Sequence, residues 1–100
     1  MTKEQALNLV KRYVAEQASV SGVELLVMED ETMTTEFGWI FFYNTKAYIE
    51  GGDEMAIIVG AAPIIVDKTS GKLEVAGTAY PIEHYIEMYR RHRTCHPERS

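Results

Sequence analysis

Apolar residues recur with helical spacing near the start of the chain. Across residues 6–14 they lie three or four positions apart, and charged side chains fill most of the positions between them. Thr2 has the side chain of a helix N-cap, and Gln5, three residues later, completes a capping box. We therefore predict a helix that begins after Thr2 and ends near Gln17 or Ala18.

A second apolar stripe predicts a helix near the other end of the chain. Pro81 suits the first position of a helix, because proline has no backbone N–H to leave unpaired there. The apolar side chains that follow have i, i+3, i+4, i+7 spacing and are Ile82, Tyr85, Ile86 and Tyr89.

Between the helices, β-branched and aromatic residues predict several short strands. The strongest is residues 37–43, whose alternating positions are apolar on both faces, which indicates a central strand or one that meets a partner. Further strands are expected at residues 23–28, 64–66 and 72–76. Residues 67–71, Asp-Lys-Thr-Ser-Gly, have the composition of a tight turn joining the last two strands.

Residues 46–58 have the least regular pattern. Tyr48 and Ile49 favour a short strand or sheet edge, and two consecutive glycines at 51 and 52 end it. Residues 54–59 fit either a helical turn or a short strand.

The order helix, strands, helix predicts one α+β domain over residues 1–93. Its core should be a mainly antiparallel, four-stranded sheet with the N- and C-terminal helices packed on one face. Residues 94–100 are polar and are expected to form a flexible tail.

Charge and composition narrow the classes of function. Residues 1–89 hold six Lys/Arg and fourteen Asp/Glu, a net charge of −8, and this acidic body argues against a nucleic-acid surface. The four arginines of residues 90–100 fit a solvated helix end, where basic residues complement the helix dipole, and a nucleic-acid role for this segment is the alternative interpretation. No apolar stretch could span a bilayer, no signal-peptide pattern opens the chain, and a single cysteine cannot form an internal disulfide. We expect a cytoplasmic protein.

Candidate catalytic chemistry is sparse. His92, Cys95 and His96 are close enough along the chain to share a metal, but Pro97 interrupts the helix and there is no second cysteine pair. A Cys–His nucleophilic pair needs a pocket, which a polar tail is a poor place to build. The glycines form no phosphate-binding loop. We expect no catalytic residue, metal or cofactor.

Two acidic segments are the better candidates for a binding surface. Their residue types allow a solvated loop, a docking surface for a basic protein, or a site for a cation or for acid–base catalysis, although the spacing lacks the pattern of a calcium loop. Tyr48 lies near the second segment and could act as an interface anchor. The candidate partner-binding residues are Glu29, Asp30, Glu31, Glu36, Glu50, Asp53, Glu54 and Tyr48.

The ordered combination of several segments resembles the YrhB-type family, also called the immunity protein 35 family. The segments are Gly-Trp-Ile-Phe-Phe-Tyr at 38–43, Pro-Ile-Ile-Val-Asp-Lys-Thr-Ser-Gly at 63–71, Gly-Thr at 77–78, and the tyrosines of the last helix. The chain departs from the expected pattern at Ala61 and Ala62, where an asparagine would follow the glycine. The resemblance implies a non-catalytic bacterial protein that binds and neutralises a cognate toxin, or a small chaperone-like protein that binds unfolded clients. Both a monomeric and a homodimeric state of the protein are compatible with either role.

Overall fold

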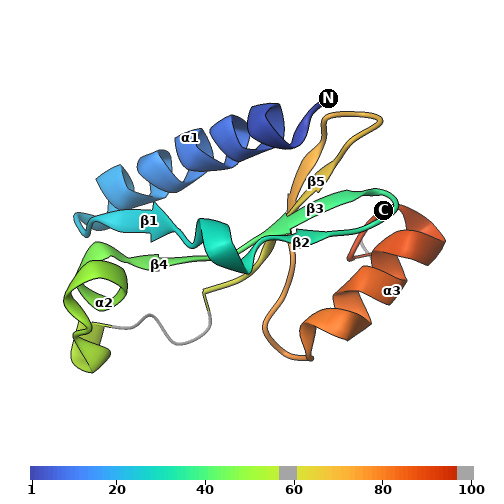
Figure 1. Ribbon diagram of the computed structural model, residues 1–100. Coiled ribbons are helices and arrows are strands. Elements are labelled where there is room, and N and C mark those ends of the chain that lie inside the picture. Colours follow the sequence, from blue (N-terminus) through green and yellow to red (C-terminus); the bar gives the residue numbers. More distant parts are fainter. Residues whose placement is uncertain (57–60, 97–100) are drawn as a thin grey trace.

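Helices lie at both ends of the chain and a set of short antiparallel strands lies between them (Figure 1). The computed structural model describes residues 1–56 and 61–96. The elements are α1 (Lys3–Ser21), β1 (Leu25–Val27), η1 (Glu29–Glu31), β2 (Met33–Thr34), β3 (Gly38–Phe41), β4 (Tyr43–Thr45), α2 (Lys46–Gly51), η2 (Glu54–Ala56), β5 (Ile64–Asp67), β6 (Leu73–Val75) and α3 (Ile82–His92). No helix in this part of the chain is both long and apolar enough to cross a membrane.

The main sheet has four antiparallel strands in the order β2-β3-β5-β6, and β1 pairs with β4 in a separate two-stranded ladder. The predicted strand 37–43 is thus divided between β3 and β4. A hydrogen bond from the Met28 amide to the Phe42 carbonyl, 2.7 Å, lies between the two ladders. The segment β1-η1-β2 therefore forms one long hairpin with β3-β4, interrupted by the 3₁₀ turn η1.

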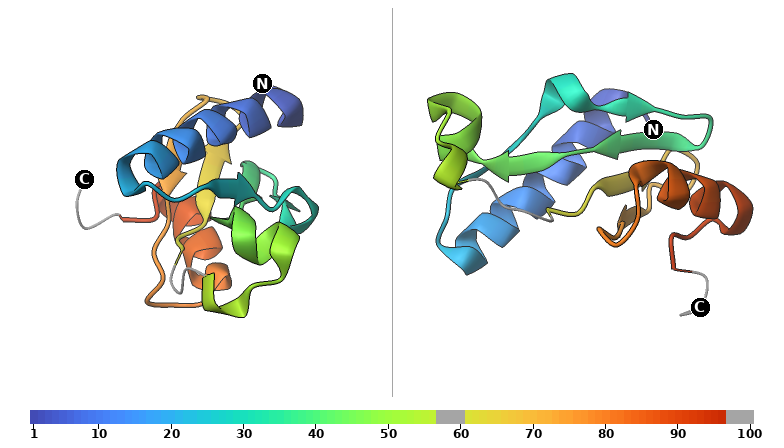
Figure 2. Two further views of the ribbon diagram at one scale, coloured as in Figure 1. Left: turned by 90° about the vertical axis from the view of Figure 1, so that its left-hand side faces the viewer. Right: turned by 90° about the horizontal axis from the view of Figure 1, so that it is seen from below.

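The helices cover opposite faces of the sheet, so the prediction that both pack on one face is wrong. Trp39 and Phe41 of β3 face the core beneath α1, whereas Ile40 faces the core with α3. Figure 2 shows α1 and α3 on either side of the strands. The physical reason is that β3 and β5 are apolar on both faces, and each face needs its own cover. The α+β class and the four-stranded antiparallel sheet are confirmed.

Local chemistry explains where several elements begin and end. The capping box of Thr2 and Gln5 is present, and α1 continues beyond its predicted end to Ser21. The turn after β5 forms as predicted, with the Asp67 carboxylate accepting the Thr69 and Ser70 amides.

The strand predicted around Tyr48 and Ile49 is wrong, because these residues belong to helix α2. The Thr45 side chain caps α2 by accepting the Tyr48 amide at 3.1 Å, and it also donates to the Ala56 carbonyl at 2.8 Å. Gly52 ends the helix with a φ of 65°. Helix capping therefore outweighs the strand propensity of two side chains. Residues 54–56 form the helical turn η2, and residues 57–59 of that prediction lie outside the described part of the chain.

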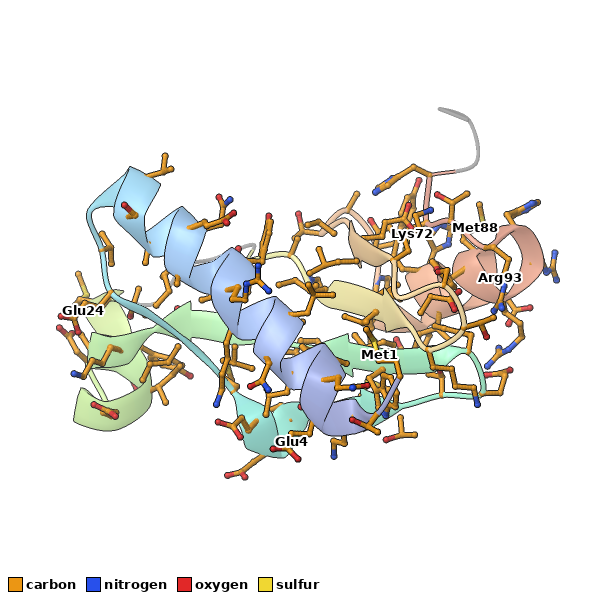
Figure 3. The ribbon with its side chains drawn as sticks, turned by 90° about the horizontal axis from the view of Figure 1, so that it is seen from above. Met1, Glu4, Glu24, Lys72, Met88 and Arg93 are labelled. Atoms are coloured by element: carbon orange, nitrogen blue, oxygen red, sulfur yellow. The ribbon has the colours of Figure 1, made fainter. Side chains whose placement is uncertain are left out.

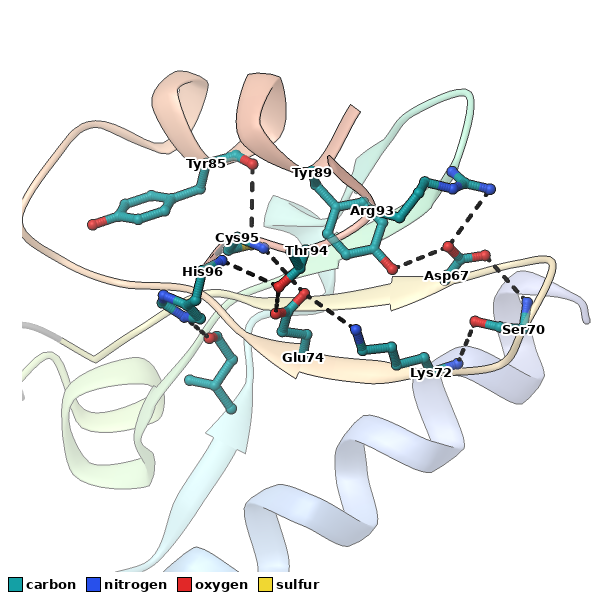
Figure 4. Close-up of polar contacts among 11 residues, drawn as sticks. Asp67, Ser70, Lys72, Glu74, Tyr85, Tyr89, Arg93, Thr94, Cys95 and His96 are labelled. Atoms are coloured by element: carbon teal, nitrogen blue, oxygen red, sulfur yellow. Dashed lines mark hydrogen bonds and ion pairs between the residues drawn. The ribbon is translucent and has the colours of Figure 1, made fainter. Parts of the chain in front are cut away.

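Asp67 is a buried carboxylate that joins the β5–β6 turn to α3 (Figure 4). Besides the two turn amides, it accepts the Tyr89 hydroxyl at 3.0 Å and lies 3.7 Å from the Arg93 guanidinium. Burial favours a higher pKa for Asp67, but these hydrogen bonds and Arg93 outweigh it and hold the pKa below its ordinary value.

Residues 94–96 pack against β6, although the sequence placed them in a polar tail (Figure 4). The Thr94 hydroxyl and the Cys95 amide both donate to the Glu74 carboxylate, and a His96 ring nitrogen lies 3.0 Å from the Val75 carbonyl. Cys95 is 5% exposed and belongs to the α3 core. Residues 97–100 of the expected tail lie outside the described residues.

Replacing Gly38 with alanine should destabilise the fold. An added Cβ would lie 2.0 Å from the Val66 carbonyl oxygen, and the φ of 156° is one that other residues rarely adopt. We expect G38A to lower the free energy of unfolding by about 3 kcal/mol or more in urea denaturation. The matched control is G51A, since a Cβ at Gly51 in α2 meets open space, and it should leave stability unchanged or raise it by about 0.5–1 kcal/mol. Equal effects of the two substitutions would contradict this account.

Replacing Asp67 with asparagine should reduce stability in a pH-dependent way. Because the folded-state pKa of Asp67 is lowered, its contribution is present above the unfolded pKa and is lost as pH falls through the folded pKa. We expect D67N to cost about 1.5 kcal/mol near pH 7, and the difference from wild type to shrink below about pH 4. The check is urea denaturation across pH 2.5–7, with E83Q on the exposed side of α3 as control. A D67N effect of the same size at every pH would refute the assignment.

Candidate functional site

A groove with an acidic rim lies between η1 and the α2–η2 segment. It brings together two parts of the sequence that are about twenty residues apart. Its lining residues are Val27, Met28, Glu29, Asp30, Glu31, Tyr48, Ile49, Gly52 and Glu54.

The ladder between β1 and β4 holds one of these two segments at each of its ends. Leu25 pairs with Thr45 and Val27 pairs with Tyr43, so the strands are antiparallel: η1 leaves the ladder at its Val27 end and α2 leaves it at its Thr45 end. The groove lies between these two ends. Helix α2 packs against both strands. The Thr45 side chain binds the start of α2 and the end of η2 at once, which holds the second wall of the groove.

Negative charge dominates the rim of the groove. Four carboxylates line it, while the lining residues include no lysine or arginine. Lys11 of α1 reaches Glu29 from outside at 3.4 Å, and both side chains are about half exposed, so this pair is weak and screened by salt. Tyr48 and Ile49 are half-buried and offer apolar area beside the carboxylates. Such a surface suits a protein segment that carries basic and apolar side chains.

Five of the eight residues proposed from the sequence line this one groove. They are Glu29, Asp30, Glu31, Tyr48 and Glu54.

The other three have structural contacts elsewhere. Glu36 binds the Arg90 guanidinium through both carboxylate oxygens, and this hydrogen bonding lowers the pKa of Glu36 to about 2. Glu50 lies 3.9 Å from Lys46 on α2, and the Asp53 carboxylate accepts the Met55 amide at 3.0 Å. A role for these three in partner binding stays a prediction.

The groove also contains residues that sequence reasoning missed. Val27, Met28 and Ile49 had the apolar character of strand core, and only the actual pairing of β1 with β4 shows that they line a groove. The one available indication was the pattern Thr45-Lys46-Ala47-Tyr48 before two glycines, which is consistent with a capped helical turn.

The histidine and cysteine group does not form a reactive centre. Cys95 is buried, with its sulfur 4.0 Å from the Tyr85 carbonyl, and the His96 ring binds the Val75 carbonyl instead of the thiol. Desolvation by burial raises the pKa of the Cys95 thiol to about 12. Over residues 1–56 and 61–96, no group of three or more His, Cys, Asp or Glu side chains is placed to hold a metal ion.

Comparison with known families identifies the family of this chain. The family model described as immunity protein 35 matches residues 4–90, which is most of the sequence. The chain belongs to the immunity protein 35 family. The resemblance drawn from the sequence segments is therefore confirmed. Immunity protein families are in general non-catalytic and act on a protein partner.

A curated relative of this immunity protein 35 chain is the uncharacterized protein YrhB of Escherichia coli (strain K12). The two are 44% identical over 52 residues, which is 52% of this chain and 55% of YrhB. The match thus spans about half the length of that relative. No solved structure matches the chain.

The thiol of Cys95 should react slowly in the folded protein. Its raised pKa leaves little thiolate at pH 8, whereas an unfolded cysteine, with a pKa of about 8.5, is substantially ionised. We expect iodoacetamide to modify Cys95 about 100-fold more slowly in buffer than in urea, as followed by mass spectrometry. E74Q should speed the native reaction, because Glu74 holds Thr94 and Cys95 in place. Native and denatured rates within a factor of two would show that the thiol is exposed.

Proposed function

We propose that this protein neutralises a cognate toxin domain by stoichiometric binding and catalyses no reaction. The observation that carries the proposal is the acidic groove, which two separate segments line with four carboxylates and with apolar side chains. Family membership supports a protein as the partner. The proposal places the protein in the cytoplasm as a monomer or homodimer, with no nucleic acid, membrane, metal or cofactor involved.

The groove would act in two stages. Its carboxylates attract a basic surface of the toxin over about 10 Å, the screening length at 0.1 M salt, and so raise the association rate. Tyr48 and Ile49 then pack against apolar side chains of the partner and slow dissociation, as buried anchors do in other interfaces. The toxin would be blocked by occlusion of its own functional surface.

A chaperone-like role is the second candidate, since several large apolar side chains are exposed. Met55 is 93% exposed and Val20 is 85% exposed. A general binder of unfolded clients needs such exposed apolar surface. Suppression of the aggregation of several unrelated proteins would support this role, and no suppression would count against it.

The deciding experiment uses the protein product of the adjacent gene as the candidate toxin. Calorimetry should show binding with fixed stoichiometry, and co-expression should restore growth to cells that express that product. If the protein neither binds that product nor restores growth to the cells that express it, the proposal is wrong.

Neutralising the groove carboxylates should slow association with that product. We expect E31Q combined with E54Q to lower the association rate about tenfold at low salt and to weaken its dependence on salt, with a smaller change in dissociation. Surface plasmon resonance between 20 and 300 mM NaCl is the measurement. The charge-matched control is E16Q combined with E83Q, on exposed positions of α1 and α3. If the two double substitutions change the association rate equally, the change is due to the net charge of the protein and not to the groove.

A further inference from the structure

A second groove lies on the other side of α2. Its lining includes Val23, Glu24, Lys46, Ala47, Gly51 and Ala56. Helix α2 separates the two grooves: Ala47 and Gly51, four residues apart, line this one, whereas Tyr48 and Ile49 line the acidic one. The short helix is therefore a ridge with a groove along each side.

This second groove is mainly apolar, and one exposed large hydrophobic residue lines it. In the described part of the chain, large hydrophobic residues are exposed at Met1, Val20, Val23, Met55 and Tyr80. Val23 lines the groove and is 46% exposed. Val20 and Met55 are neighbours in sequence of the lining residues Ser21 and Ala56. An apolar groove can accept an apolar side chain of a protein partner.

The charges at the rim of the second groove are compatible with a basic partner. Lys46 is the only basic residue among the lining residues, and it lies 3.4 Å from Glu24 and 3.9 Å from Glu50. Two carboxylates offset its single positive charge, so the rim does not repel a basic protein. Figure 3 shows Glu24 beside α2, at the end of the molecule away from Arg93.

The size of α2 allows one partner to cover both grooves. An α-helix with its side chains is about 10 Å across, and six residues extend for about 9 Å. A standard protein interface covers about 800 Å² on each partner, a patch roughly 30 Å wide. A partner that binds in the acidic groove therefore extends over the ridge to the apolar one. The C-terminal end of α1, the start of β1 and α2 all lie at this end of the molecule (Figure 1).

We propose that the toxin straddles α2, with basic side chains in the acidic groove and an apolar side chain inserted in the second groove between α2 and Val23. This inference rests on the proposed function and adds a second contact surface to it. The carboxylates of the acidic groove set the rate of association, and the apolar groove adds to Tyr48 and Ile49 in lengthening the lifetime of the complex.

Two neutral substitutions test the apolar groove. A47Q fills it without changing charge, and V23T removes apolar surface while keeping the shape of the side chain. Each should weaken binding to the adjacent gene's product about tenfold through faster dissociation, with the association rate and its salt dependence unchanged. The control is A15Q, at an exposed position of α1, which should bind like wild type. Circular dichroism and thermal melting report whether each variant is folded. If A47Q does not fold, the dissociation rate of V23T alone tests the proposal.

The outcomes separate the two proposals. If the wild-type protein does not bind the product, the proposed function fails and this inference fails with it. If wild type binds, while folded A47Q and V23T dissociate at the wild-type rate, only the inference is overturned. If light scattering shows a wild-type dimer that A47Q converts to a monomer, the groove joins two copies of this chain, which also overturns it.

Discussion

The central strand β3 is buried on both faces, and the rest of the fold depends on this constraint. All four of its residues are buried, and their side chains alternate between the core under α1 and the core under α3. Gly38 allows the backbone of β5 to come close, because any side chain there would overlap the Val66 carbonyl. Each face must be covered by a separate helix, so α1 and α3 cannot lie together.

The same hairpin supports the candidate site. Strand β3 continues into β4, whose pairing with β1 holds η1 at one end of the ladder and α2 at the other, with the groove between them. On the far side, the Asp67 and Glu74 contacts fasten α3 and the residues after it to the β5–β6 hairpin. The charges are also separated between these two parts of the molecule. The carboxylates of the groove lie near α2, and the arginines lie at the C-terminal end of α3. The α2 end is therefore the part of the molecule best suited to a basic partner.

Much of the local structure could be predicted from short-range patterns. The capping box at Thr2, the turn at Asp67 and the burial of both faces over residues 37–41 each depend on neighbouring residues, and each is confirmed. Residues 42 and 43 of the predicted strand are only partly buried. The pairing of segments that are distant in the sequence could not be predicted from such patterns. The two acidic segments were found separately, but only the β1–β4 ladder brings them into one groove, and the side of the sheet taken by each helix depends on the path of the chain between them.

The proposed function requires a basic protein partner to bind across the acidic groove. Amide hydrogen exchange, measured with and without the adjacent gene's product, tests this claim most directly. We predict that the product slows exchange in residues 27–31 and 48–54 and leaves the exposed side of α3 unchanged. Binding that protects α3 and leaves both walls of the groove unprotected would contradict the account.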